Sequence, residues 1–591
     1  MDGVARRGWR ERTGLLVLYL ALGMAPAARA GVSVQIDGLD GELRSAALAH
    51  VELAEYADRD VSAAQVRRLY ARAPEQIAAA LEAYGYYEPQ VDGELHEAPG
   101  GWTARFAVRR GEPVRVTALD IALADPARGL AAVRTALAAF APRLGEPFEH
   151  AAYERSKAAI QAALLANGFL DAHLLPTTPR VEVSRAAHSA RIRLAWDTGT
   201  RYRIGTVHFE GAPFPDTFLA RYVPWESGAE YAQERLLALQ RRLADTDYFA
   251  GVEVTPEIDQ ARDGIVPIRV VLIPAKRSVY TGGLFVGTDT GFGGRVGLER
   301  RWMNARGHKL KAEAILAQRL ETVTAQYLIP LPGPDDRSFN FGANFKKETT
   351  ASSTSRTASL VANETRQWLG FTRTLGLHAL SGNFEIAGRH GQSTVLFPEI
   401  GLVRKRADDP AFVRDGYALT LLARAARRGL IADTSFVQVR ADAKWIHGFS
   451  ERQRVILRGS LGATRVDDFS ALPPDLRFFA GGDRSIRGYG YQAIGPRQPN
   501  PRSQKPETVG GTHLAVASVE YEYYFRRDWG VAAFVDAGDA FFDRAFSAKV
   551  GAGLGLRWRS PVGMLRLDVA TPIRDRDERG LKLHLVIGPD L

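Results

Sequence analysis

The chain has 591 residues, a formal net charge of +10 at pH 7 and no cysteine. A single hydrophobic core does not grow to this size, so several domains are expected. The absence of cysteine excludes disulfides, thiolate metal sites and a cysteine nucleophile. The modest positive charge fits either contact with anionic lipid phosphates or solvated lysines and arginines spread over the surface, and no nucleic-acid partner is expected.

The first thirty residues have the three parts of a secretory signal peptide. Four arginines lie in residues 6–12, an apolar run covers residues 14–24, and Ala28-Arg29-Ala30 offers a cleavage site with small residues at both ends. The apolar run is too short to cross a bilayer core, which needs about 20 residues. We therefore expect cleavage between Ala30 and Gly31 and export to a Gram-negative envelope.

Residues 31–276 contain a repeat of roughly 80 residues. The segment 111–116 reads Gly-Glu-Pro-Val-Arg-Val and the segment 199–204 reads Gly-Thr-Arg-Tyr-Arg-Ile, and apolar residues follow both at the same period-two offsets. A shorter relative, residues 32–36, opens the first unit. The repeat therefore predicts three consecutive units, each opened by a strand.

Helical patterns follow the opening strands. In the third unit, Leu236, Leu239 and Leu243 fall on one face of a helix, which needs a sheet to cover it. The first two helices end near Gly85 and Gly168, which suit a left-handed position after a helix. Alternating apolar residues close the units at 106–108, 192–196 and 268–272. We predict three small α+β domains, at 31–110, 111–198 and 199–276.

From about residue 277 to residue 591 the pattern changes to strands throughout. In residues 550–558, apolar side chains alternate with glycine or arginine, and the same alternation recurs along this part of the chain. A soluble antiparallel sheet would alternate in the same way, but nothing in the sequence supplies a second packing layer. A transmembrane barrel needs no such layer, because lipid covers the apolar face. At about 20 residues per strand and connection, the length predicts an all-β barrel of about 16 antiparallel strands.

A long, proline-rich connection lies between strands predicted near 455–463 and 513–525. Its centre, residues 478–489, resembles the lid-loop signature of the Omp85 superfamily, whose core is Arg-Gly-Phe/Tyr. The longer string through residue 496 is similar to that of TamA-like members, the outer-membrane subunits of the translocation and assembly module. The resemblance implies that the three α+β units are POTRA domains. The residues that match the lid-loop signature are Gly481, Gly482, Asp483, Arg487, Gly488 and Tyr489.

In this superfamily the lid loop folds into the barrel and its arginine pairs with an acidic residue of the inner wall. The resemblance implies that Arg487 is this arginine and Asp536 its partner. Strand periodicity supports the assignment, because Phe534 and Asp536 then face inward while Val535 faces lipid. The alternative is a solvated loop arginine and an unrelated lumen carboxylate.

The resemblance also implies a seam at which the first barrel strand, around 279–285, meets the last, around 581–587. This pairing is expected to be short or weak and able to open sideways, so that the strand edges could template a client strand. Glycine weakens a strand interior, although it is common throughout this barrel. The chain also ends on Gly588-Pro589-Asp590-Leu591 and not on an aromatic residue. The predicted seam residues are Gly282, Gly283, Leu284, Leu583, Leu585 and Ile587.

No pattern for an enzyme was found. The sequence has no Gly-Lys dipeptide, and therefore no Walker A loop, and neither an HExxH nor a GxSxG string. We expect no enzymatic activity and no cofactor.

Three functions remain as hypotheses. The first is a TamA-like assembly factor with an inner-membrane-anchored TamB-like partner and autotransporter-type outer-membrane clients. The second is a two-partner secretion transporter that exports a dedicated exoprotein through the lumen, and the third is a passive pore. Two-partner transporters usually have two POTRA domains and simple porins have none, so three units favour the first hypothesis.

Overall fold

The computed structural model describes residues 31–57, 59, 61–98, 101–176, 180–331, 337–429, 431–560, 563–573, 580–588 and 590. The expected signal peptide, including Ala30, lies outside these residues, and Gly31 begins the first strand. The chain forms two compact units. One runs to Ile204 and includes residues 228–234 and 261–266, and the other holds residues 205–227, 235–260 and 267–591.

The first α+β domain packs its helices on a three-stranded sheet of order β1-β3-β2, in which β1 runs parallel and β2 antiparallel to β3. Ser62 caps the longest helix by accepting a hydrogen bond from the backbone N–H of Gln65. Ile77 and Phe106 meet in the buried core. Its elements are β1 (Gly31–Asp37), α1 (Gly41–His50), η1 (Glu52–Tyr56), α2 (Ala63–Glu82), β2 (Gln90–Ala98) and β3 (Gly101–Arg109).

The second domain has the same plan. Its central strand β7 runs parallel to β4 and antiparallel to β5 and β6. Gly168, with φ of +98°, follows the last helix, as the sequence predicted. Its elements are β4 (Arg115–Ala122), α3 (Asp125–Arg128), α4 (Ala131–Ala138), α5 (His150–Ala166), β5 (His173–Leu174), β6 (Val181–Ser184) and β7 (Ser189–Asp197).

The third domain has the sheet order β8-β10-β9. Leu236, Leu239 and Leu243 of its helix are buried, and Asp247, with φ of +61°, takes the left-handed position that glycine holds after the earlier helices. Its elements are β8 (Arg203–Glu210), α6 (Asp216–Leu219), η2 (Ala220–Tyr222), α7 (Gln233–Ala244), β9 (Phe249–Pro256), η3 (Ile258–Gln260) and β10 (Ile265–Pro274). Among the described residues, no helix is long and apolar enough to cross a membrane.

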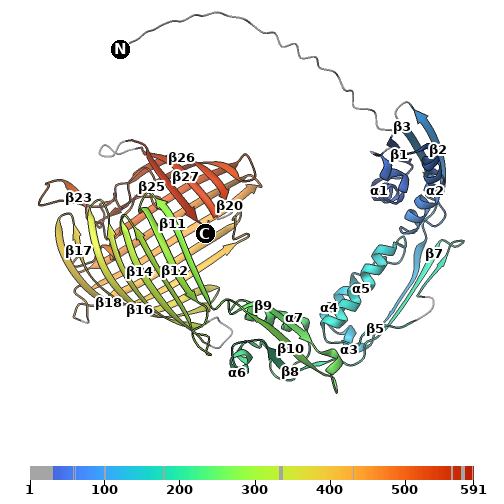
Figure 1. The fold of residues 1–591 in the computed structure, drawn as a ribbon, viewed down its shortest axis with the longest axis horizontal. Coiled ribbons are helices and arrows are strands. Elements are labelled where there is room, and N and C mark those ends of the chain that lie inside the picture. Colours follow the sequence, from blue (N-terminus) through green and yellow to red (C-terminus); the bar gives the residue numbers. More distant parts are fainter. Residues whose placement is uncertain are drawn as a thin grey trace, which may run out of the picture. The chain divides into compact units, whose positions relative to one another are not determined.

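The rest of the chain is a nearly closed antiparallel barrel, drawn from green to red in Figure 1. It has 16 strands, which confirms the predicted fold class. The strands are β11 (Ser278–Gly287), β12 (Gly291–Arg300), β13 (Lys309–Ala317), β14 (Leu320–Pro330), β15 (Ser338–Thr349), β16 (Ser353–Trp368), β17 (Phe371–Ile386), β18 (Arg389–Ala407), β19 (Gly416–Ala426), β20 (Phe436–Ser450), β21 (Gln453–Val466), β24 (His513–Tyr524), β25 (Trp529–Phe541), β26 (Lys549–Ser560), β27 (Gly563–Pro572) and β28 (Lys582–Gly588).

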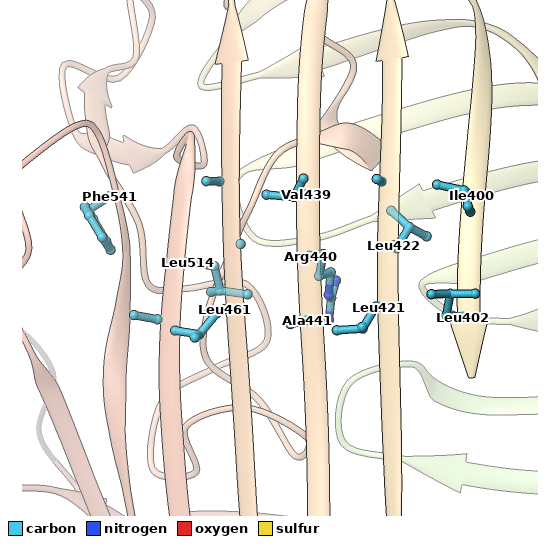
Figure 2. Close-up of a pocket in the computed structure, with 14 residues that line it drawn as sticks. Ile400, Leu402, Leu421, Leu422, Val439, Arg440, Ala441, Leu461, Leu514 and Phe541 are labelled. Atoms are coloured by element: carbon cyan, nitrogen blue, oxygen red, sulfur yellow. The ribbon is translucent and has the colours of Figure 1, made fainter. Parts of the chain in front are cut away.

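The two faces of the barrel wall differ as the alternation predicted. On β25, Val535 is 49% exposed, while Phe534 and Asp536 are buried. Figure 2 shows a shallow, largely apolar pocket that extends across β18–β21, β24 and β25, lined by side chains such as Leu421 and Val439. The apolar face therefore points to the membrane and the polar face to the lumen.

Candidate functional site

The lid loop, residues 467–512, joins β21 to β24 and folds into the lumen. It contains η4 (Pro474–Leu476) and a short hairpin of β22 (Arg497–Pro499) and β23 (Pro506–Thr508). Gly481, Gly482 and Gly488 have φ of +95°, +100° and +92°. Glycine adopts this left-handed conformation without a steric penalty, so the matched glycines allow the tight bends of the loop.

Apolar side chains of the loop pack against the barrel wall, and glycines of the wall allow this close approach. Phe478, Ile486 and Tyr489 of the loop are buried in one cluster with residues of β24 and β25. A Cβ at Gly551 of β26 would lie 1.8 Å from the carbonyl oxygen of Arg487, and one at Gly462 of β21 would lie 2.4 Å from the Phe478 ring. The glycines on the inner face of these strands thus make the space that the loop occupies.

The structure brings Arg487 and Asp536 together. Nε and Nη2 of Arg487 donate to the two Asp536 oxygens at 2.8 and 3.0 Å, and the Arg487 backbone N–H donates to the same carboxylate at 3.0 Å. Only 3% of Arg487 is exposed. Two parallel N–H bonds to one carboxylate are the geometry for which a guanidinium is suited.

Two further carboxylates bind the same arginine. Nη1 of Arg487 donates to Glu520 of β24 at 2.7 Å and to Asp568 of β27 at 2.9 Å. Its Cζ also lies 3.3 Å from the centre of the Phe534 ring. A buried guanidinium carries one positive charge, so three carboxylates around Arg487 require more cations nearby.

Arg557 of β26 is one of these cations. It is fully buried and donates to Glu520 at 2.5 Å, to Glu522 at 2.7 Å and to Asp568 at 2.5 Å. It shares two carboxylates with Arg487, so the loop arginine is part of a network and not of one isolated pair.

The network continues to the last described residue. Arg454 of β21 donates to Glu522 at 2.6 Å and to Asp590 at 2.8 Å. Arg566 of β27 and Lys444 of β20 also donate to Asp590. Asp590 is buried among these cations, which lie on the inner face of the barrel wall.

Sequence reasoning placed Asp536 but did not connect the other charges to Arg487. The alternation did put Arg557 and Asp568 on the non-apolar face of their strands. The same parity places Glu520 and Glu522 of β24 on the inner face. Two acidic residues at period two on one strand are the signal that could have identified the network. Within the described ranges, no three His, Asp or Glu side chains are placed to hold a metal ion.

The seam lies between β11 and β28, the two ends of the sheet order. A short or weak pairing was expected there, and among the described residues no backbone ladder joins residues 278–287 to residues 582–588. Leu284 is 80% exposed and Leu583 is 54% exposed, and both project from the lipid face. The other predicted seam residues lie on the same two strands: Gly282, Gly283, Leu585 and Ile587.

Comparison with known families identifies this architecture. A profile described as the Omp85 superfamily domain matches residues 303–590, which include the lid loop and most of the barrel. The chain belongs to the Omp85 superfamily. The profile of the first POTRA domain of TamA matches residues 33–110, and a POTRA profile, described as a surface antigen variable number repeat, matches residues 202–272. This member of the superfamily is an outer-membrane barrel with periplasmic POTRA domains.

Known proteins show how far the similarity extends. The outer membrane protein assembly factor BamA of Nitratidesulfovibrio vulgaris is 23% identical over 393 residues, which are 63% of this chain and 49% of BamA. This chain therefore spans about half the length of that relative. The structure of BamA from Haemophilus ducreyi lacking POTRA domains 1–3 has a TM-score of 0.69 at 17% identity, with 80% of this chain and 99% of that chain covered. The barrel and POTRA domains of that BamA structure therefore have the same fold as this chain. CdiB from Escherichia coli has a TM-score of 0.45 at 12% identity, with coverage of 88% and 96%.

Proposed function

We propose that this protein inserts other β-barrel proteins into the outer membrane by opening its seam sideways. The observation that carries the proposal is that, among the described residues, no ladder joins β11 to β28, whereas every other pair of neighbouring barrel strands is joined by one. An edge strand presents unpaired N–H and C=O groups to which a client strand can add. This mechanism templates a strand and needs no covalent catalysis.

Two features support a TamA-like role within this function. The first POTRA domain, residues 33–110, matches the TamA type. The lid-loop string through residue 496 is similar to that of TamA-like members. On this proposal the partner is an inner-membrane-anchored TamB-like protein, the clients are autotransporter-type barrels, and outer-membrane lipid surrounds the seam.

A disulfide across the seam tests the proposal. Because the chain has no cysteine, only the introduced pair can form a disulfide within it. Cysteines replace Leu284 of β11 and Leu585 of β28. The control pair replaces Leu554 and Val569, which are register partners on β26 and β27. Both pairs are oxidised in reconstituted membranes, and insertion of an autotransporter barrel is measured before and after reduction.

We expect oxidation of the seam pair to abolish insertion, reduction to restore it, and the control pair to have no effect, since its strands are already joined. If the locked seam still inserts clients, lateral insertion is wrong. Export of an exoprotein through the lumen, past Arg487, is then the function to test.

A further inference from the structure

The lid loop contacts both sides of the seam through one residue, Asp483. On the β11 side, the hydroxyl of Thr288 donates to both carboxylate oxygens of Asp483 at 3.0 Å. Thr288 immediately follows β11, in the turn to β12. The backbone N–H of Asp483 also points to the carboxylate of Asp289 in this turn, at 3.5 Å.

On the other side, His584 of β28 contacts the loop with both ring nitrogens. Its Nε2 accepts a hydrogen bond from the backbone N–H of Gly488 at 3.0 Å, and its Nδ1 lies 2.5 Å from Oδ1 of Asp483. A nitrogen that accepts carries no proton, so the imidazole proton lies on Nδ1 and is donated to Asp483. Only 3% of His584 is exposed.

These contacts lie at the same rim of the barrel. Alternate strands run in opposite directions, so the end of β11 and the start of β28 meet at one rim. The fit there is close, because a Cβ at Gly482 would come within 3.1 Å of the Asp289 carboxylate. The Asp483 carboxylate thus binds a side chain on each side of a seam that no backbone ladder joins in the described strands.

The two sides are not held equally. The loop is anchored by Arg487 to β24, β25 and β27, strands of the wall that ends in β28. The β11 side is reached through Thr288 and Asp289 alone among the described contacts of Asp483. Hydrogen bonds to a carboxylate are stronger than neutral ones, but a single exposed hydroxyl is easily replaced by water.

We infer that Asp483 is a clasp across the seam, so that this rim can widen only when Asp483 releases Thr288 or His584. The clasp couples docking of the lid loop to closure of the seam. Its use in client insertion rests on the proposed function, but the clasp itself is a property of the protein without client.

The test measures the width of the seam directly. Spin labels are placed on cysteines that replace Val286 of β11 and Leu583 of β28, both on the lipid face near this rim. Distances between the labels are measured by electron paramagnetic resonance on the full chain in bilayer discs. The variants are Asp483→Ala, the exposed neighbour Arg484→Ala as control, and Thr288→Val with Thr288→Ser as its hydroxyl-retaining control.

We expect Asp483→Ala to shift the distribution to longer distances, and Thr288→Val to shift it in the same direction by less. Arg484→Ala and Thr288→Ser should match the parent. Asp483→Asn, which keeps an oxygen acceptor for both partners, should give an intermediate distribution.

The heat-modifiable electrophoretic mobility of each variant reports whether its barrel is folded. If Asp483→Ala does not fold, Thr288→Val, which changes only a turn hydroxyl, decides the question. A distribution equal to that of the parent in the folded Asp483→Ala variant, or in Thr288→Val, would overturn the clasp. Failure of the seam disulfide to block insertion would instead overturn the proposed function and leave these distances unchanged.

Discussion

The two walls of the barrel that meet at the seam hold very different side chains. The C-terminal wall, made of β21 and β24–β28, buries arginines, carboxylates and His584 around the lid loop. In the N-terminal wall, β11–β18, the buried polar groups among the described residues are hydroxyls. Those hydroxyls belong to Ser353, Ser355, Thr357 and Ser393.

This difference shows that the lid loop is held unequally by the two walls. Its buried ion pairs, made by Arg487, go to the C-terminal wall, to which β28 belongs, whereas its ion pairs with the N-terminal wall, Lys346–Asp475 and Arg502–Glu385, are partly exposed. The first strand β11 contributes no charged side chain to this network. The seam therefore joins an anchored strand to a weakly held one, and we expect β11 to be the strand that moves.

The largest expected effect comes from removing the anchor. Arg487→Ala leaves Asp536, Glu520 and Asp568 buried without their shared cation. Breaking a buried ion pair costs about 3–5 kcal/mol. We expect the loop to leave the wall, which would be seen as new protease cleavage within residues 478–489. Arg484→Ala, in the same loop but exposed, should show the parent cleavage pattern.

A smaller effect is expected from filling the space below the loop. The new methyl group of Gly551→Ala would overlap the Arg487 carbonyl, and overpacking costs about 1–3 kcal/mol. The matched control is Gly459→Ala on β21, where the nearest atom to a Cβ is 4.0 Å away. Protease protection of the loop should fall in the first variant and not in the second. Equal protection would mean that the loop does not rest on Gly551.

A change at Asp590 tests whether the far end of β28 is anchored as well. Asp590→Asn removes the charge that binds Arg454 and Arg566 but keeps one oxygen acceptor. We expect a loss of about 1.5 kcal/mol, the lower value for a hydrogen bond to a charged group, because the amide keeps one acceptor for the arginines. Backbone hydrogen exchange should become faster in β28 and remain unchanged in β11. Faster exchange in β11 alone would contradict the asymmetry of the two walls.

The smallest expected effect is a pH dependence of the seam width, caused by the ionisation of Asp289 beside β11. Burial, together with the nearby Asp483 carboxylate, raises the pKa of Asp289 in its turn to about 6. A raised carboxyl pKa favours the docked state when Asp289 is protonated, so this contribution is present below about pH 4 and is lost as pH rises through 6. The spin-label distances should therefore lengthen slightly between pH 4 and 7. Asp289→Asn should remove this dependence, and an unchanged pH response in that variant would exclude Asp289 as its source.

Local sequence patterns predicted the architecture well. Period-two alternation placed Asp536 inward and Val535 outward, and helical stripes with their terminal glycines predicted the three α+β domains. Gly85 and Gly168 adopt the left-handed conformation predicted after the first two helices. Each of these features depends on a few neighbouring residues, which is why the sequence reveals them.

The features that were missed depend on residues far apart in the chain. The contacts of Glu520 and Asp568 with Arg487 require both the strand register and the position of a folded loop. The contact of Asp483 with His584 spans 101 residues. The missing ladder at the seam depends on how the whole barrel closes, and no local pattern encodes it.

The enclosed position of the lid loop also constrains the order in which this protein folds. The loop precedes β24–β28 in the chain, yet its centre lies against the inner face of those strands. The buried centre of the loop, which Arg487 holds against β24, β25 and β27, cannot easily be threaded into a barrel that has already closed. The loop must therefore be in place before or while the last strands assemble around it, which makes its contacts late-forming and of high contact order. Because no backbone ladder joins β11 to β28 among the described residues, the final strands can close around a loop that is already bound to the inner wall.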